Sequence, residues 1–517
     1  MKIERSENAK RNIVFGTMLK IYQMVIPFMM RTAMIYLLGV EYVGLNSLFA
    51  SVLQVLNIAE LGVGSAMVYS MYKPIAEDDK ITICALMNLY KIYYRVIGMI
   101  ILGLGIIIVP FIPKLISGHI PIDINIYILY LLNLGTTVLS YWLFAYKNSI
   151  LQAHQRTDMI SKVMLFTDTI KYVLQIGVLF IFHNYYYYII VILITQIMTN
   201  IITAVVSDKM YPQYKSKGKL SKDMIKQINQ RIRDLFTSKI GMVIVNSVDT
   251  IVISAFLGLT VLAVYQNYFY LITAITGIIG TVFTSVTAGI GNSIIVESKE
   301  KNFQDLNKFT FIIAWISGVC VSCFLCLFQP FMSIWVGKEF LLDFSVVICL
   351  CIYFFVYEIN QLLNTYKDAA GIWNEDRFRP LVTAFTNLVM NLIMVQFMGI
   401  YGIVLSTILS ALFVGMPWLL HNLFTVLFDK KQLVPYLKRL LFYVVIVFFS
   451  TFATYHICNL FNQSDVLLIL IRLVICMIVP NGIFFVAYYR MKEFKHSVQL
   501  ADKMTRGKLV FLKKLGA

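Results

Sequence analysis

The chain has 517 residues, of which 59% are apolar and 14% are charged. Soluble domains typically hold roughly 45–50% apolar and about 25% charged residues, so this composition excludes a soluble enzyme, a disordered chain and a disulfide-rich secreted domain. The formal charge of +17 would suit a nucleic-acid partner, but the basic residues lie mostly between long apolar runs. That pattern is typical of a protein embedded in a bilayer.

The apolar runs are each long enough for a transmembrane helix. We predict an all-α integral membrane protein with 14 transmembrane helices. In chain order they cover 13–38, 43–71, 83–113, 124–146, 161–182, 185–206, 235–257, 261–288, 309–330, 344–365, 380–398, 401–427, 438–458 and 465–489.

Lysine and arginine indicate the orientation. With the N-terminus inside, 36 of the 44 Lys and Arg residues fall in inside segments, and the outside loops hold Lys114 and Lys338. Because basic residues concentrate in cytoplasmic loops, this split predicts a multi-pass protein of the plasma membrane with both termini cytoplasmic. We expect the basic segments 207–234 and 490–517 to contain amphipathic helices that bind anionic membrane lipids. We consider this more consistent with their sequence than binding to nucleic acid.

The two halves of the chain contain a weak repeat. The segments RTAMIYLLGVEYVGLNSLF, from Arg31, and DTIVISAFLGLTVLAVYQNYF, from Asp249, place a Thr, an apolar run, a Leu-Gly pair and a Phe in the same order. Repeats of equal topology are related by an axis along the membrane normal. We therefore predict two six-helix lobes as parallel-topology repeats around a central cleft, plus two C-terminal helices. The expected parts are an N-lobe (1–206), a basic cytoplasmic linker (207–234), a C-lobe (235–430), the two last helices (431–489) and a basic cytoplasmic tail (490–517).

Cations at membrane depth are candidates for binding an anionic substrate. An ionised side chain at the centre of a membrane helix costs about 2.5–3.5 kcal/mol on insertion scales, so it is a functional candidate by default. Lys20 and Lys239 have an alternative, which is to snorkel to the inner surface. Lys91 and Arg95 share one face of their helix, which could instead be solvated near the inner surface. Lys171 could instead be neutralised by Asp168, three residues earlier. The predicted substrate-binding cations are Arg31, Lys91, Arg95, Lys20, Lys239 and Lys171.

Carboxylates at membrane depth are candidates for gating and ion coupling. Arg31 and Asp249 occupy equivalent places in the two halves, and we expect a gate between them that an anionic ligand opens by competing for the guanidinium. Asp249, Glu60 or Glu358 could bind a coupling H+ or Na+. Gly62 and its neighbours, in the segment NIAELGVGSAM, permit close helix approach or a local break beside Glu60. The alternative is a pair within one lobe or a hydrogen bond to a neighbouring helix.

Three cysteines, Cys320, Cys323 and Cys326, recur at a spacing of three, like the ligands of a metal cluster. We expect them instead to pack as small residues on a helix with no fourth partner, and we expect no metal site. Arg472 lies outside the repeat, so it is the weakest candidate for a functional role among the charged residues at membrane depth.

The segment EYVGLNSLFASVLQVLNIAELGVGSAMVYSMYKPIAEDD, residues 41–79, resembles the start of the Wzx-type bacterial polysaccharide flippases, which export O-antigen or capsule repeat units. In such proteins a Gly-Leu turn and an E-L-G-[VI]-G-x-A stretch follow the first helix, and the E-L-G motif corresponds to Glu60–Gly62 here. The resemblance is strongest over about residues 1–150. It implies the multidrug/oligosaccharidyl-lipid/polysaccharide exporter superfamily, shared with multidrug and toxin extrusion (MATE-like) transporters and lipid II flippases. It also implies an undecaprenyl-diphosphate-linked oligosaccharide as substrate, moved through a cationic lumen without hydrolysis.

Residues and resemblance together predict an alternating-access flippase and not an enzyme, with no cofactor and with H+ or Na+ coupling. The expected partners are the lipid-diphosphate-linked oligosaccharide, anionic lipids, a polysaccharide polymerase and glycosyltransferases. The alternatives are a lipid II flippase, a cation-coupled drug antiporter, which would favour an acidic cleft, and a membrane polysaccharide polymerase or glycosyltransferase. For the last, Asp78 and Asp79 are the nearest inside metal ligands, and we expect them in a solvated turn.

Overall fold

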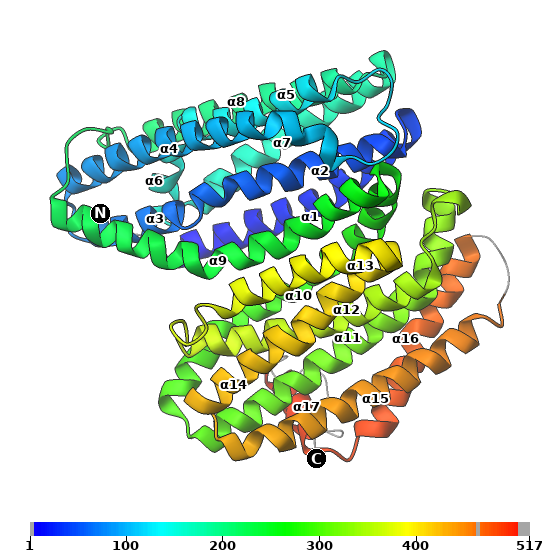
Figure 1. The fold of residues 1–517 in the computed structure, drawn as a ribbon. Helices are drawn as coiled ribbons and strands as arrows, with labels where there is room; N and C mark the ends of the chain where they lie inside the picture. The colour runs from blue at the N-terminus through cyan, green and yellow to red at the C-terminus, as the bar shows by residue number, and fades with distance from the viewer. Residues whose placement is uncertain (1–4, 462–465, 505–517) are drawn as a thin grey trace. The chain divides into compact units, whose positions relative to one another are not determined.

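The computed structural model describes residues 5–461 and 466–504, so the part of the predicted tail beyond Met504 lies outside the described residues. Every regular element in the described ranges is a helix. The helices form two compact units, Met1–Ala263 and Val264–Ala517, and the boundary falls in the first turns of α10 (Figure 1).

The first unit is a bundle in which α1 packs on α7, α7 on α8, α4 on α5, and α2 on α9. Its helices are α1 (Arg5–Leu37), α2 (Val40–Leu56), α3 (Val63–Ala76), α4 (Lys80–Ile108), α5 (Ile126–Trp142), α6 (Asn148–Ala153), α7 (Thr157–Phe182), α8 (Tyr185–Met210) and α9 (Lys222–Leu257). Short 3-10 helices connect some of them: η1 (Asn57–Glu60), η2 (Val109–Leu115) and η3 (Ala145–Lys147).

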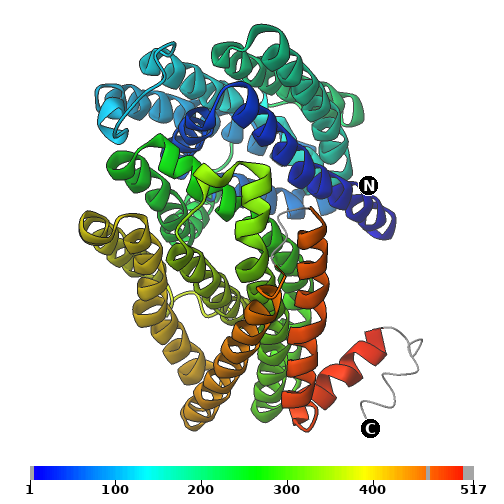
Figure 2. The same ribbon diagram turned by 90° about the vertical axis from the view of Figure 1, so that its right-hand side faces the viewer.

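The second unit is built around α11, which packs against α12, α15, α16 and α17. Helices α15 and α16 run side by side, and α17 turns away at the end of α16 (Figure 2). Its elements are α10 (Leu259–Val296), α11 (Lys299–Trp335), η4 (Lys338–Phe340), α12 (Phe344–Ala369), α13 (Arg379–Ser410), η5 (Ala411–Gly415), α14 (Met416–Val426), η6 (Lys430–Gln432), α15 (Leu433–Cys458), α16 (Val466–Tyr488) and α17 (Lys492–Met504).

Polar residues in the connections begin several helices. Ser221 accepts a hydrogen bond from the Met224 amide at 3.3 Å, and Ser298 accepts one from the Lys301 amide at 3.2 Å. Asn125 does the same for the first turn of α5. These side chains satisfy amide groups that have no partner inside the helix, so the short polar segments between the apolar runs fix where each helix starts.

Twelve helices of the described ranges are long and apolar enough to cross a membrane, or thirteen if α5 and the bent segment after it form one span. The chain is therefore a multi-pass membrane protein, while the total of fourteen stays a prediction. The difference lies partly in Arg379–Val426, which counts as one stretch of 48 residues. Gly399 breaks it, with φ 54° and ψ −136°.

This stretch folds back on itself at Gly399. The Asn387 side chain donates to Thr407 Oγ1 at 3.0 Å, although twenty residues of continuous helix would separate the two by about 30 Å. A Cβ on Gly402 would lie 2.5 Å from the Met394 carbonyl oxygen, so the two arms are in backbone contact. The hairpin agrees with the two separate helices predicted over 380–398 and 401–427.

Helix α9 joins the predicted linker to the membrane without a break. It starts at Lys222 and spans 36 residues, so the amphipathic helix expected within 207–234 is the beginning of a membrane-spanning helix. The connection before it is docked on α4, since Asn88 donates to the Gly218 carbonyl at 2.9 Å and the Lys215 amide to Cys84 Sγ at 3.3 Å. By its packing α9 belongs to the first unit, whereas the repeat assigns it to the second lobe. The division into repeat-related lobes stays a prediction.

Candidate functional site

The membrane helix that carries Glu60 is broken at this residue. Helix α2 ends at Leu56, η1 covers Asn57–Glu60, and α3 starts at Val63. Gly62 makes the turn with φ 88°, a conformation that favours glycine, and a Cβ there would lie 2.6 Å from Cβ of Leu235 on α9. The break predicted as one possibility from the glycines is confirmed, and it presents Glu60 at a helix end.

Tyrosines from α4 and α5 surround the broken segment. Tyr94 donates to Glu60 Oε1 at 3.3 Å, and Tyr90 donates to the Tyr94 hydroxyl at 2.5 Å. Tyr141 donates to Asn57 Oδ1 at 3.2 Å. Glu60 is half-buried and interacts electrostatically with Lys239 on α9. The arrangement joins a carboxylate, hydroxyl donors and a cation within the first unit, a set that can hold or exchange a proton or a small cation.

Four of the predicted substrate-binding cations have no ion-pair partner within residues 5–461 and 466–504. Lys20, Arg95 and Lys239 are exposed, and Lys91 is half-buried with its ammonium 6.0 Å from the centre of the Tyr146 ring. Because a cation facing hydrocarbon is costly, these side chains need water, the membrane interface or an anionic ligand. All four belong to the first unit.

Lys171 behaves differently from these four cations. Its ammonium lies 2.6 Å from Asp168 Oδ1 on the same face of α7, and Gln23 of α1 donates to the other carboxylate oxygen at 3.3 Å. The local pair named as the alternative for Lys171 is present. A ligand would have to displace Asp168 to use this lysine.

Arg31 and Asp249 are both half-buried, on α1 and α9, and both lie in the first unit. Arg31 interacts electrostatically with Tyr188, which is buried on α8. The gate between Arg31 and Asp249 stays a prediction.

Glu358 lies in the second unit, on α12, and is fully buried. Its carboxyl interacts with Thr276 of α10. The burial separates Glu358 from the half-exposed Glu60, because an ion from water would reach Glu358 only after the surrounding helices move.

The acidic pair considered for a glycosyltransferase site contributes to a turn. Asp79 caps α4, accepting hydrogen bonds from the Thr82 amide at 3.0 Å and from its hydroxyl at 2.5 Å. These hydrogen bonds lower the pKa of Asp79. Capping accounts for this carboxylate without a metal.

Two charged or reactive clusters were missed by sequence reasoning. Arg379 and Asp376 form a buried bidentate pair with N–O distances of 2.6 and 2.8 Å, which the i, i+3 spacing could have suggested. The expectation that the clustered cysteines have no further partner is wrong for Cys326, which meets Cys458 and Cys476. Those partners are more than a hundred residues away in sequence, so no local pattern revealed them.

Comparison with known proteins identifies the family. The model of the family described as "Polysaccharide biosynthesis protein" matches residues 9–288, more than half of the chain. The chain belongs to this polysaccharide biosynthesis protein family. No curated protein matches it.

The fold of this polysaccharide biosynthesis protein is found in several solved transporters. A lipid II flippase MurJ in an inward closed conformation matches with a TM-score of 0.66 and 18% identity over 92% of this chain and 99% of that chain. An inward-facing MATE family transporter of the MOP superfamily matches with a TM-score of 0.58 and 14% identity, over 80% and 96%. A mutant of the Vibrio cholerae MATE transporter VcmN matches with a TM-score of 0.53 and 15% identity, over 81% and 96%. At these identities the likeness shows the fold, which is that of flippases and transporters.

Proposed function

We propose that this protein is an alternating-access flippase that moves an undecaprenyl-diphosphate-linked oligosaccharide from the inner to the outer leaflet of the bacterial plasma membrane, and that it is not an enzyme. One structural observation carries the proposal: Lys20, Lys91, Arg95 and Lys239 lie on membrane helices of one unit without ion-pair partners among the described residues. The family and the fold support the same function.

A diphosphate head group suits this set of cations. It carries two or so negative charges, and hydrogen bonds to charged groups are worth about 1.5–3 kcal/mol each. Lys and Arg bind phosphate oxygens, while the tyrosines near Glu60 offer surfaces and hydroxyls for sugars. The lipid tail can remain in the bilayer while the head group passes, so the transfer needs no covalent chemistry.

The cations also separate this proposal from a drug antiporter. A cationic drug would be repelled by Lys20 and Arg95, which are exposed and have no carboxylate within ion-pair distance in the described ranges. A lipid II flippase shares the fold and an anionic diphosphate ligand, so it is the second candidate and a defined outcome of the test below.

The test measures flipping in proteoliposomes containing the purified protein. A lipid-diphosphate oligosaccharide with a fluorescent sugar is placed in both leaflets, and a membrane-impermeant quencher reports the fraction that changes leaflet. We expect faster exchange than in protein-free vesicles. Each of Lys20→Gln, Arg95→Gln and Lys239→Gln should lower the rate roughly tenfold, because a charge-assisted contact is lost.

Lys299→Gln is the matched control, since Lys299 is an exposed cation at the first residue of α11 and its substitution should not affect the rate. Unchanged rates in all three membrane variants would refute the cationic path. Faster exchange of lipid II than of the oligosaccharide-linked lipid would assign the protein to the second candidate. Transport of a cationic dye, with neither lipid exchanged, would refute both flippase functions.

A further inference from the structure

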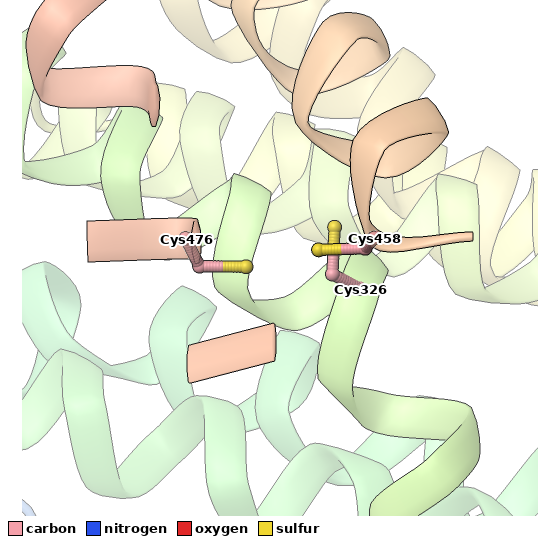
Figure 3. Close-up of side chains that lie close together, drawn as sticks. All are labelled: Cys326, Cys458 and Cys476. Atoms are coloured by element: carbon pink, nitrogen blue, oxygen red, sulfur yellow. The ribbon is translucent and has the colours of Figure 1, made fainter. Parts of the chain in front are cut away.

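Three cysteines from distant parts of the chain meet inside the second unit. Cys326 lies on α11, Cys458 is the last residue of α15, and Cys476 lies on α16. Their Sγ atoms are all within 4.8 Å of one another, and all three residues are fully buried. Figure 3 shows the three side chains reaching toward one another from three separate helices.

A fourth cysteine adjoins this cluster. Cys323 lies one helical turn before Cys326 on α11 and packs against the other three residues. Its thiol interacts with that of Cys476. A tetrahedral zinc ion with Zn–S bonds of about 2.3 Å holds its sulfurs about 3.8 Å apart, so a small inward shift brings the sulfurs of Cys326, Cys458 and Cys476 to this distance.

Arg472 gives an independent reason to expect negative charge here. Its guanidinium donates to the Cys326 carbonyl at 3.1 Å, to Asn459 Oδ1 at 3.4 Å and to the Phe461 carbonyl at 3.5 Å, all of which are neutral acceptors. In the described part of the chain no carboxylate lies within ion-pair distance of it. The guanidinium interacts electrostatically with the thiols of Cys326 and Cys458.

We propose that Cys326, Cys458 and Cys476 form a binding site for a thiophilic metal ion, Zn²⁺ or Cu⁺, with Cys323 available as a fourth ligand. Each thiol that becomes a ligand releases its proton to water, and the metal does not change its oxidation state. With Zn²⁺, three thiolates and the Arg472 guanidinium the charges sum to zero, whereas with Cu⁺ the sum is zero when two of the thiols are ionised. This balance matters because an uncompensated charge at a buried site is costly.

A bound metal ion would cross-link three helices of the second unit. Helices α11, α15 and α16 each contribute a ligand, and α16 follows residues 462–465, a segment outside the described ranges. A metal ion that binds only the folded protein would stabilise the folded state. The free energy gained would rise with the logarithm of the ratio of the metal concentration to its dissociation constant. The role is structural and is separate from the cations proposed for substrate in the first unit.

The experiment uses the full-length protein in detergent, reduced, treated with a chelator and kept without oxygen. It is titrated separately with Zn²⁺, Cu⁺ and Mg²⁺, and with Co²⁺ as a spectroscopic probe. We expect one Zn²⁺ or Cu⁺ per chain, no Mg²⁺, and a sulfur-to-cobalt charge-transfer band that reports thiolate ligation. Zn²⁺ or Cu⁺ should also raise the apparent melting temperature.

Single Cys→Ser variants at 326, 458 and 476 should weaken binding by at least the roughly 10- to 100-fold that loss of an outer-shell partner costs. Cys323→Ser shows whether three or four thiolates bind. Cys349→Ser is the matched control, because Cys349 is also buried but lies on α12 outside the cluster, where its thiol interacts with Tyr401. If a variant does not fold, the number of metal ions bound per wild-type chain and the sulfur-to-cobalt charge-transfer band of the wild-type protein still test the proposal. Binding of clearly less than one Zn²⁺ or Cu⁺ per wild-type chain, equal binding by the cluster and control variants, or a disulfide between two of the three cysteines that persists after treatment with reductant would overturn the proposal.

Discussion

Glu60 is the residue where the ion coupling predicted from the sequence can be tested most directly. It is half-buried at a helix break and accepts a hydrogen bond from Tyr94. Glu60→Gln keeps the size and a hydrogen-bond acceptor but removes the proton-binding group. We expect the variant to lose the stimulation of flipping by an H+ or Na+ gradient while retaining basal exchange. Transport with each gradient imposed separately measures this.

Glu77→Gln is the control for this prediction. Glu77 is an exposed carboxylate at the end of α3, in a loose pair with Lys73 at 3.8 Å, and its removal should leave the gradient response intact. An unchanged response in Glu60→Gln would show that coupling does not use this carboxyl. Glu358→Gln would then be the next variant, since Glu358 is the buried acid of the second unit.

Residue-scale prediction from sequence succeeded where partners are local. The Lys171–Asp168 pair follows from a spacing of three on one helix, and the structure contains it. Prediction failed where the partners come from other helices. The spacing of residues along the sequence indicates neither the contact of Cys326 with Cys458 nor the neutral acceptors around Arg472. Long-range packing decides those contacts, and one sequence does not encode it as a visible pattern.

Helix packing around Gly44 gives a prediction at the scale of elements. A Cβ at this position of α2 would lie 2.2 Å from the Leu259 carbonyl oxygen, a rigid backbone atom in the first turn of α10, which belongs to the first unit. Gly44→Ala should therefore force the helices apart and destabilise the first unit by about 1–3 kcal/mol, the usual cost of overpacking. A lower apparent melting temperature in detergent, with less folded protein recovered, would show it.

Gly135→Ala on α5 provides the comparison, because nothing lies within 4 Å of the added Cβ. Alanine is favoured over glycine inside a helix by up to about 1 kcal/mol, so this variant should melt at the same temperature or higher. Equal melting temperatures for the two variants would contradict the close approach of Gly44 to Leu259 within the first unit.

The sequence predicted most helices but not all of the breaks and connections between them. Apolar runs and polar caps located the long helices, because hydrocarbon demands internally bonded backbone over a fixed length. Gly62 suggested a break that is present, and the hairpin at Gly399 agrees with two predicted helices. The uninterrupted passage of α9 from the basic linker into the membrane was missed, since the change in composition near residue 235 resembles an end.

At the scale of the whole molecule, the fold class follows from composition, while the grouping of helices does not. The membrane fold shared with flippases and transporters was predicted from apolar runs and a short motif. The sequence repeat assigns α9 to the second lobe, whereas its packing assigns it to the first unit. The two differ because a repeat shows which segments of the two halves are equivalent, and packing shows which helices are in contact. Orientation is a third property, and it depends on the distribution of charge along the whole chain.

The charge distribution predicts which loops face the cytoplasm, and two exposed lysines allow a matched test. Lys338 lies in a predicted outside loop and Lys431 in a predicted inside loop, and both side chains are exposed. In a Cys84→Ala background, Lys338→Cys should react with a membrane-impermeant maleimide in intact cells. Lys431→Cys should react only after permeabilisation, because translocating the basic inside segments is unfavourable. The parent Cys84→Ala protein reports labelling of the remaining cysteines, and the reverse pattern would invert the direction of flipping proposed above.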